Sequence, residues 1–134
     1  MAEEIARRAH LGQTEESTGD DYIRHIERVV DLVTGDDEKA VAWLHDVIED
    51  SPITGADLLA AGISARIVFA VVRLTRDEAT TSYFEYIRQI KDSGDHLAIA
   101  VKTADLIDHL RPNCPERLRP RYEMACETLG VKLP

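Results

Sequence analysis

Apolar residues recur at three- and four-residue steps through almost the whole of this 134-residue chain. After residue 21, for example, Ile26, Val29, Val30 and Val33 fall on one side of a helix. No stretch alternates apolar and polar residues for long enough to indicate a half-buried strand. The pattern therefore predicts an all-α fold.

Glycine, proline and short polar runs divide the pattern into about seven to eight helices. The first covers residues 2–10, and the second is capped by Asp20 or Asp21 and ends at Gly35. The others are expected at residues 38–49, 55–61, 64–75, 82–91, 95–110 and 115–129. Because the chain has the size of one domain, we expect a single helical bundle over residues 1–134.

The charge of the chain limits its partners. The formal net charge is −9 at pH 7 and the isoelectric point is about 4.9, so the chain has no long basic surface for nucleic acid or an anionic membrane. A small phosphate ester is not excluded, because a divalent cation in an acidic cleft reverses the local field.

The cysteines and the hydropathy pattern together predict the cellular compartment. The cysteines are typical of a protein in a reducing compartment. Cys114 and Cys126 do not have the spacing of a zinc knuckle or a redox motif. The N-terminus has no apolar signal core, and no apolar run approaches the length of about 18–20 residues that a membrane span needs. We expect a cytoplasmic protein with no membrane partner, and nothing in the pattern specifies an oligomeric state.

The segment WLHDVIEDS at residues 43–51 concentrates ionisable groups on one predicted helix. Residues four apart lie on the same helical face, so His45 is expected over Glu49 and Asp46 over Asp50. Four such groups among apolar neighbours are costly to bury unless they are paired or bind a metal. Acidic residues at a helix end are also often simply solvated, which is the alternative for Glu49 and Asp50.

Two more segments complete a set of candidate metal ligands. Asp105 follows an almost apolar run at residues 97–101, and His25 borders the buried face of its own helix. Together with His45 and Asp46 they give two imidazoles and two carboxylates from three helices, which suit a borderline or hard divalent ion. Taken alone, His25 would be a core histidine and Asp105 a buried acid with a cationic partner.

Other polar side chains near these segments have two possible roles. Lys102 and Arg111 are candidate phosphate-binding cations, or charges on an exposed face. His109 shares a helical face with Asp105 and is either a phosphate ligand or a partner of the metal site. His10 and Gln13 are expected to anchor the following loop by hydrogen bonds.

The order of these residues resembles a known family. His25, His45-Asp46 and Asp105 follow the H…HD…D pattern of the HD superfamily of metal-dependent phosphohydrolases. The segments AHLGQ (9–13), YIRH (22–25), WLHDVIEDS (43–51), VRLT (72–75) and VKTAD (101–105) are similar to the alarmone-hydrolase domain of RelA/SpoT proteins and their small free-standing relatives. The resemblance spans about residues 4–111.

The resemblance implies an HD-type helical fold with a central metal cleft, and one divalent metal ion bound by His25, His45, Asp46 and Asp105. Manganese is the first choice, and magnesium, cobalt, iron or zinc are alternatives. It also implies that Glu49 and Asp50 place or activate the attacking water, and that the reaction removes a 3′-pyrophosphate from a guanosine nucleotide.

The chain departs from this family at two places. The family has an Arg-Lys-Ser-Gly-type loop that packs on guanine, whereas this chain has TEESTG at residues 14–19, and it has His109 where the family has asparagine. Glu15 and Glu16 cannot stack on a base as a guanidinium does, and they would repel a tetraphosphorylated nucleotide. We therefore expect weak hydrolysis of guanosine tetraphosphate and preference for another nucleotide.

Three hypotheses follow for the function. The first is an alarmone-type nucleotide pyrophosphohydrolase, and the second is an HD-type hydrolase of another phosphate ester, such as a nucleoside monophosphate or a modified dinucleotide. The third is a catalytically silent nucleotide-binding regulatory module. The chemistry that we favour is attack of metal-activated water on a phosphate or pyrophosphate ester, without a covalent intermediate.

Overall fold

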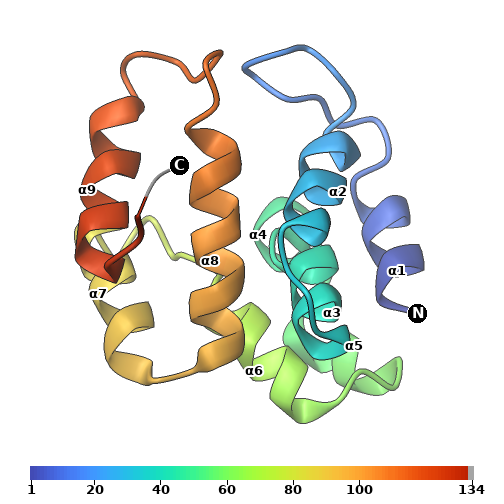
Figure 1. The fold of residues 1–134 in the computed structure, drawn as a ribbon. Helices are drawn as coiled ribbons and strands as arrows, with labels where there is room; N and C mark the ends of the chain where they lie inside the picture. Colours follow the sequence, from blue (N-terminus) through green and yellow to red (C-terminus); the bar gives the residue numbers. More distant parts are fainter. Residues whose placement is uncertain (133–134) are drawn as a thin grey trace.

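The computed structural model describes residues 1–132 and contains nine helical segments in that range (Figure 1). They are α1 (Ala2–Ala9), α2 (Ile23–Asp31), α3 (Asp36–Leu44), α4 (Val47–Asp50), α5 (Gly55–Ala60), α6 (Ala65–Arg73), α7 (Tyr83–Ser93), α8 (His96–His109) and α9 (Arg119–Leu129). Among the described residues there is no strand, only an isolated bridge between Thr14 and Asp21. The all-α prediction is confirmed, and residues 133–134 of the expected domain lie outside the described part.

Three predicted boundaries are wrong. The helix expected at residues 38–49 is interrupted after Leu44, so that α3 and α4 are separate segments. Neither Asp20 nor Asp21 caps α2, whose N-cap residue is Tyr22 and has no side-chain cap. The last helix begins at Arg119, because residues 115–118 form a turn in which the Leu118 amide donates to the Pro115 carbonyl.

Other helix starts have the expected local cause. The side chains of Ser64, Ser82 and Asp95 accept hydrogen bonds from backbone amides in the first turn of α6, α7 and α8. These caps satisfy donors that have no partner within the helix. At the other end of α7, Gly94 adopts φ 66°, a conformation that costs glycine little, and this lets the chain reverse into α8.

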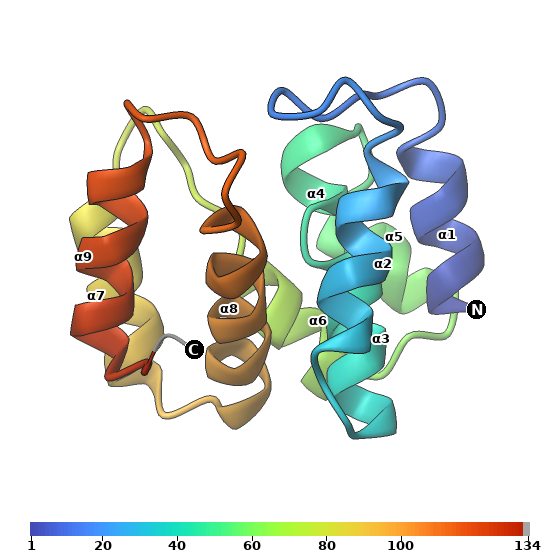
Figure 2. The ribbon, with the colours of Figure 1, turned by 45° about the horizontal axis from the view of Figure 1, so that its top comes forward.

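Helices α3 and α8 lie at the centre of the fold. α3 contacts α1, α2, α6 and α8, while α8 also packs against α7 and α9. In Figures 1 and 2 the helices α7 and α9 therefore lie on one side of α8, and α1 to α5 on the other. Their buried apolar side chains form a single cluster, with Val29, Leu44 and Leu106 among the least exposed.

Two loops meet at one end of the bundle. The loop between α1 and α2 and the loop between α8 and α9 lie at the top of both views (Figures 1 and 2). An ion pair between Glu16 and Arg117 joins them. Within residues 1–132, no helix has both the length and the apolar character that crossing a membrane would require.

Because α7 contributes to the single apolar core, shortening one of its buried side chains should cause a large loss of stability. Ile87 is fully buried, so Ile87→Ala should lower the free energy of unfolding by about 2–5 kcal/mol. Leu59 on α5 is 48% exposed, and Leu59→Ala should change it by no more than about 0.5 kcal/mol. Urea titration followed by circular dichroism measures both; equal effects would contradict this description of the core.

Candidate metal centre

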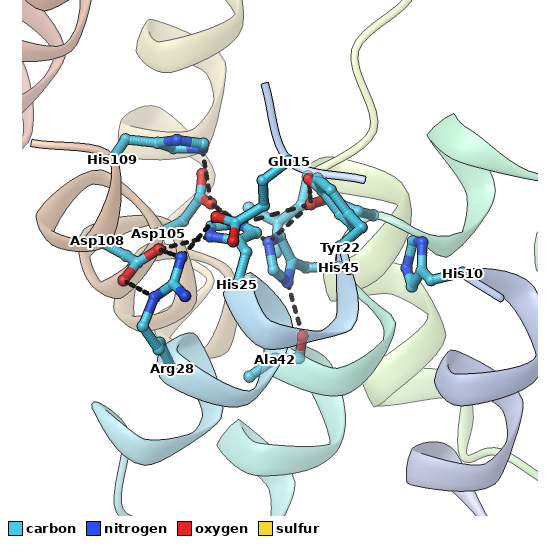
Figure 3. A network of polar contacts seen from close by, with 12 residues as sticks. His10, Glu15, Tyr22, His25, Arg28, Ala42, His45, Asp105, Asp108 and His109 are labelled. Carbon is cyan, nitrogen blue, oxygen red and sulfur yellow. Dashed lines mark hydrogen bonds and ion pairs between the residues drawn. The ribbon is translucent and has the colours of Figure 1, made fainter. Parts of the chain in front are cut away.

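Four of the predicted site residues converge at the middle of the bundle. His25 comes from α2, His45 from the end of α3, and Asp105 from α8 (Figure 3). Asp46 follows His45 in the interruption between α3 and α4. One nitrogen or oxygen atom of each lies within 4.8 Å of those of the others. The Asp105 Oδ1 atom is 3.0 Å from Nε2 of His25 and 3.3 Å from Nε2 of His45. This cluster could hold a metal ion.

The interruption of the helix makes this convergence possible. In a continuous α-helix of about 3.6 residues per turn, neighbouring side chains point about 100° apart and diverge. Here the backbone of Asp46 has φ −108° and ψ 0°, and the Nε2 atom of His45 lies 3.2 Å from Oδ2 of Asp46. The prediction of one continuous helix through His45 and Glu49 is therefore wrong, although the grouping of His45 with Asp46 is retained.

Two hydrogen bonds fix the neighbouring ligands. Nδ1 of His45 donates to the Ala42 carbonyl at 2.6 Å, which turns Nε2 towards the cluster. The hydroxyl of Tyr22 donates to Oδ2 of Asp46 at 2.6 Å. Tyr22 was not among the predicted site residues, although its position three residues before His25 places it on the same helical face.

The donor atoms fit a divalent cation. Nε2 of His25 is buried and has no hydrogen-bond partner, although it faces the carboxylates of Asp46 and Asp105. A buried nitrogen without a partner is costly, and coordination of a cation would remove that cost. Two imidazoles with two carboxylates and no thiolate are a donor set that several divalent metals accept.

The pKa shifts in the cluster indicate that its buried carboxylates are stabilised by nearby positive charge. Burial alone would lower the pKa of His25, but the adjacent carboxylates of Asp105 and Asp108 outweigh it and raise this pKa to about 9. Burial would raise the pKa of Asp46, but the neighbouring His45 reverses the effect and holds it below its usual range. Protons on the imidazoles thus balance the carboxylates in the metal-free protein.

Glu49 and Asp50 stand at the wall of the cleft in front of the cluster. Burial by the surrounding protein, together with the negative charge of Asp46, raises the pKa of Glu49 to about 7 and that of Asp50 to about 6. Both side chains remain open to the cleft. The same cleft is lined by Arg76, Tyr83, Lys102, Arg121 and Tyr122.

The three predicted substrate-binding residues have different surroundings. Lys102 is buried and donates to Oδ2 of Asp105 at 2.8 Å, which matches the alternative of a buried acid with a cationic partner. His109 lines the cleft, with Nε2 3.1 Å from Oδ1 of Asp105 and its ring stacked on Tyr122 at 4.7 Å. Arg111 does not line this cleft.

Arg111 instead lines a neighbouring pocket of about 170 Å³. This pocket lies between the two loops at the end of the bundle, and it shares the walls formed by His109 and Tyr122 with the metal cleft. Its other polar residues include Ser17, Arg28 and Asn113. The two hollows together offer room for a substrate larger than a single phosphate group.

The acidic loop differs from its expected state. Glu15 was expected to repel a tetraphosphorylated nucleotide, but it is buried, and its Oε1 accepts from Arg28 at 2.5 Å. Glu16 pairs with Arg117. Arg28 was not among the predicted site residues either, although its position three residues after His25 places it on the same face of α2.

Hydrogen bonds of His10 and Gln13 anchor the start of this loop, as predicted from the sequence. The side chain of Gln13 contacts Nδ1 of His10 at 2.7 Å. Its amide group also donates to the carbonyls of Ala9 at 3.3 Å and of Asp50 at 2.9 Å. The loop is therefore tied to the end of α4, next to the cleft.

Comparisons with known proteins agree with the fold and the resemblance. No family model matches the chain. The chain is 35% identical to a guanosine-3′,5′-bis(diphosphate) 3′-pyrophosphohydrolase of Haemophilus influenzae and 32% identical to the bifunctional (p)ppGpp synthase/hydrolase SpoT of Escherichia coli. Each alignment covers 97% of this chain, which spans about a fifth of either relative's length.

A solved structure has the same fold. It is described as a metazoan orthologue of SpoT that hydrolyses ppGpp, and it superposes with a TM-score of 0.77 at 17% sequence identity. The match covers 96% of this chain and 83% of the other. The sequence relatives thus bear out the resemblance to alarmone hydrolases, and the structural match confirms the fold.

The anchoring role of Gln13 gives a direct test. Gln13→Ala removes the contacts to His10 and to the end of α4, so the amides of residues 14–19 should exchange with solvent faster, by about tenfold if one hydrogen bond of about 1.4 kcal/mol is lost. Amide hydrogen exchange measured by mass spectrometry reports this change. The amides of α7 serve as the internal control, and a uniform change in both regions would contradict a local anchor.

Proposed function

We propose that this chain is a metal-dependent hydrolase of a nucleotide phosphate or pyrophosphate ester, of the alarmone-hydrolase type. The observation that carries the proposal is the convergence of two imidazoles and two carboxylates beside an open cleft that holds both acids and cations. The relatives named for (p)ppGpp hydrolysis support the same chemistry.

His25, His45, Asp46 and Asp105 would hold one divalent ion, with manganese the first choice. When bound, such an ion makes water more acidic, towards a pKa of about 7, and neutralises charge on the phosphoryl oxygens. Tyr22 and the Ala42 carbonyl orient two of these ligands, which keeps the donor atoms in place.

Glu49 and Asp50 are suited to hold the attacking water and to accept its proton. Their pKa values of about 7 and about 6 lie close to neutral pH, where a general base is most effective. The water oxygen forms a bond to phosphorus, the bond from phosphorus to the leaving oxygen breaks, and a proton goes to the leaving group. Arg76 and Arg121 line the cleft where they can bind phosphate oxygens.

The leading substrate is a guanosine nucleotide that bears a 3′-pyrophosphate, which hydrolysis would release. The expectation of weak activity towards guanosine tetraphosphate rested on free carboxylates at Glu15 and Glu16. That premise is weakened because Arg28 and Arg117 pair with them. A second candidate is a different phosphate ester, such as a nucleoside monophosphate, and the absence of a cationic residue at positions 14–19 favours it.

A catalytically silent nucleotide-binding module is the third candidate. It would need neither the two raised carboxyl pKa values of Glu49 and Asp50 nor their position at the wall of the metal cleft. A regulatory module has no use for such costly groups, whereas a hydrolase needs them. We therefore rank this candidate below the two hydrolases.

Loss of a metal ligand should abolish both metal binding and hydrolysis. Asp46→Ala removes a carboxylate from the cluster, so we expect loss of the single manganese ion per chain that the wild-type protein should bind after loading. Elemental analysis after gel filtration gives the metal content. The exposed Asp92→Ala on α7 is the matched control, and wild-type metal content in the Asp46 variant would overturn the ligand assignment.

Substitution of Glu49 or Asp50 should lower the rate of hydrolysis without changing metal binding. Glu49→Gln or Asp50→Asn keeps the size of the side chain but removes the base, so turnover should fall about 10²–10⁴-fold while metal content stays the same. Steady-state assays at saturating substrate measure kcat. The exposed Glu123→Gln on α9 should leave it unchanged, and unchanged turnover in the first two variants would mean that these acids are only solvated.

A substrate panel decides among the candidate functions. Manganese-loaded protein should be assayed with guanosine tetraphosphate, guanosine diphosphate, nucleoside monophosphates and a dinucleotide. We expect the tetraphosphate to give the highest kcat/KM and to release pyrophosphate. Preference for a monophosphate or dinucleotide would favour the second candidate, and binding without turnover of any compound would favour the silent module.

A further inference from the structure

A buried ionic network lies behind His25, on the side away from the metal cluster. Nδ1 of His25 is 2.7 Å from Oδ2 of Asp108, and Arg28 donates to both oxygens of Asp108, with Nε at 2.7 Å and Nη2 at 3.1 Å. Nη2 of Arg28 also contacts Glu15 at 2.5 Å (Figure 3). The network therefore joins the loop after α1 to α2 and α8.

Asp108 decides which nitrogen of His25 carries the proton. An ionised carboxylate only accepts hydrogen bonds, so Nδ1 of His25 has to donate to it. With its proton on Nδ1, a neutral imidazole presents the lone pair of Nε2 to Asp46 and Asp105. This is the tautomer that a metal ligand at Nε2 requires.

The two imidazoles of the cluster are held by different acceptors. Nδ1 of His45 donates to the Ala42 carbonyl, which is neutral, belongs to the same helix and cannot be removed by substitution. His25 depends on a charged side chain 83 residues away in the sequence, on α8. A carboxylate behind an imidazole raises its basicity more than a carbonyl does. The orientation of His25 can therefore be tested by mutation, with His45 unchanged.

The carboxylates of this network do not form a second metal site. Glu15, His25 and Asp108 also lie close enough to hold a cation. However, both oxygens of Asp108 are used by Arg28 and His25, and those of Glu15 accept from Arg28 and Thr18. The guanidinium already supplies the positive charge that these buried carboxylates need.

We propose that Asp108 is a positioning residue that sets the tautomer and the orientation of His25, with Arg28 and Glu15 holding Asp108 in place. The inference rests on the proposed function, because it takes His25 to be a metal ligand. The proposal also gives Glu15 a role. Its carboxylate accepts from Arg28, which holds Asp108 behind the metal ligand His25, so Glu15 stabilises the metal site and does not face the substrate.

The test uses the full chain with Asp108→Asn. The variant keeps the size of the side chain but loses its charge, and an amide group cannot accept at both positions from Arg28 and His25. Manganese affinity, measured by titration with detection of free Mn²⁺ by electron paramagnetic resonance, should fall about 10–100-fold. The exposed Asp31→Asn on α2 removes the same charge and should leave the affinity unchanged.

A second measurement needs no variant. In the Zn²⁺-loaded wild-type protein labelled with ¹⁵N at histidine, the His25 ring should show a proton on Nδ1 and a metal-bound Nε2. A proton on Nε2 would overturn the inference even if Asp108→Asn did not fold. Unchanged Mn²⁺ affinity in a folded Asp108→Asn would overturn it while metal binding and hydrolysis by the wild type stand. A wild-type protein that binds no metal would overturn both proposals.

Discussion

The burial of Asp46 and Asp105 side by side is the constraint on which the site depends. Two carboxylates in a protein interior repel each other and lose their hydration, so positive charge has to be close to both. Protonated His25 and His45 and the ammonium group of Lys102 supply it in the metal-free protein. A divalent cation would supply it more compactly, which is why the same residues suit metal binding.

The four residues of the cluster come from three separate parts of the chain, and the fold brings these parts together at one point. α2, the interruption after α3, and α8 contribute the four residues, and α3 is held in the centre by contacts to both other helices. The interruption at His45 gives up helical hydrogen bonds but lets two neighbouring side chains face the same position. Local irregularity of the backbone is a common feature of functional sites.

The loop at which the sequence departs from its resemblance to alarmone hydrolases is also tied to the candidate metal centre. The loop after α1 carries Glu15 into contact with Arg28, and the other loop at this end of the bundle is joined through Glu16 and Arg117. Glu15 and Glu16 of the acidic loop are also among the residues that line the pocket beside the cleft. His109 and Tyr122 form walls that this pocket shares with the cleft.

The sequence alone determined the all-α class, most helix positions and the grouping of His25, His45, Asp46 and Asp105, because apolar periodicity and the spacing of a ligand motif are local properties. Only the tertiary structure decided that the helix breaks at His45 and that Glu15 is buried. Both depend on partners distant in sequence. The break lets His45 and Asp46 meet side chains from α2 and α8, and Arg28 bonds to both Glu15 and Asp108 only when the loop and these helices pack together. Such pairings carry no local signal, since an isolated glutamate in a polar loop has the same sequence context whether it is solvated or buried.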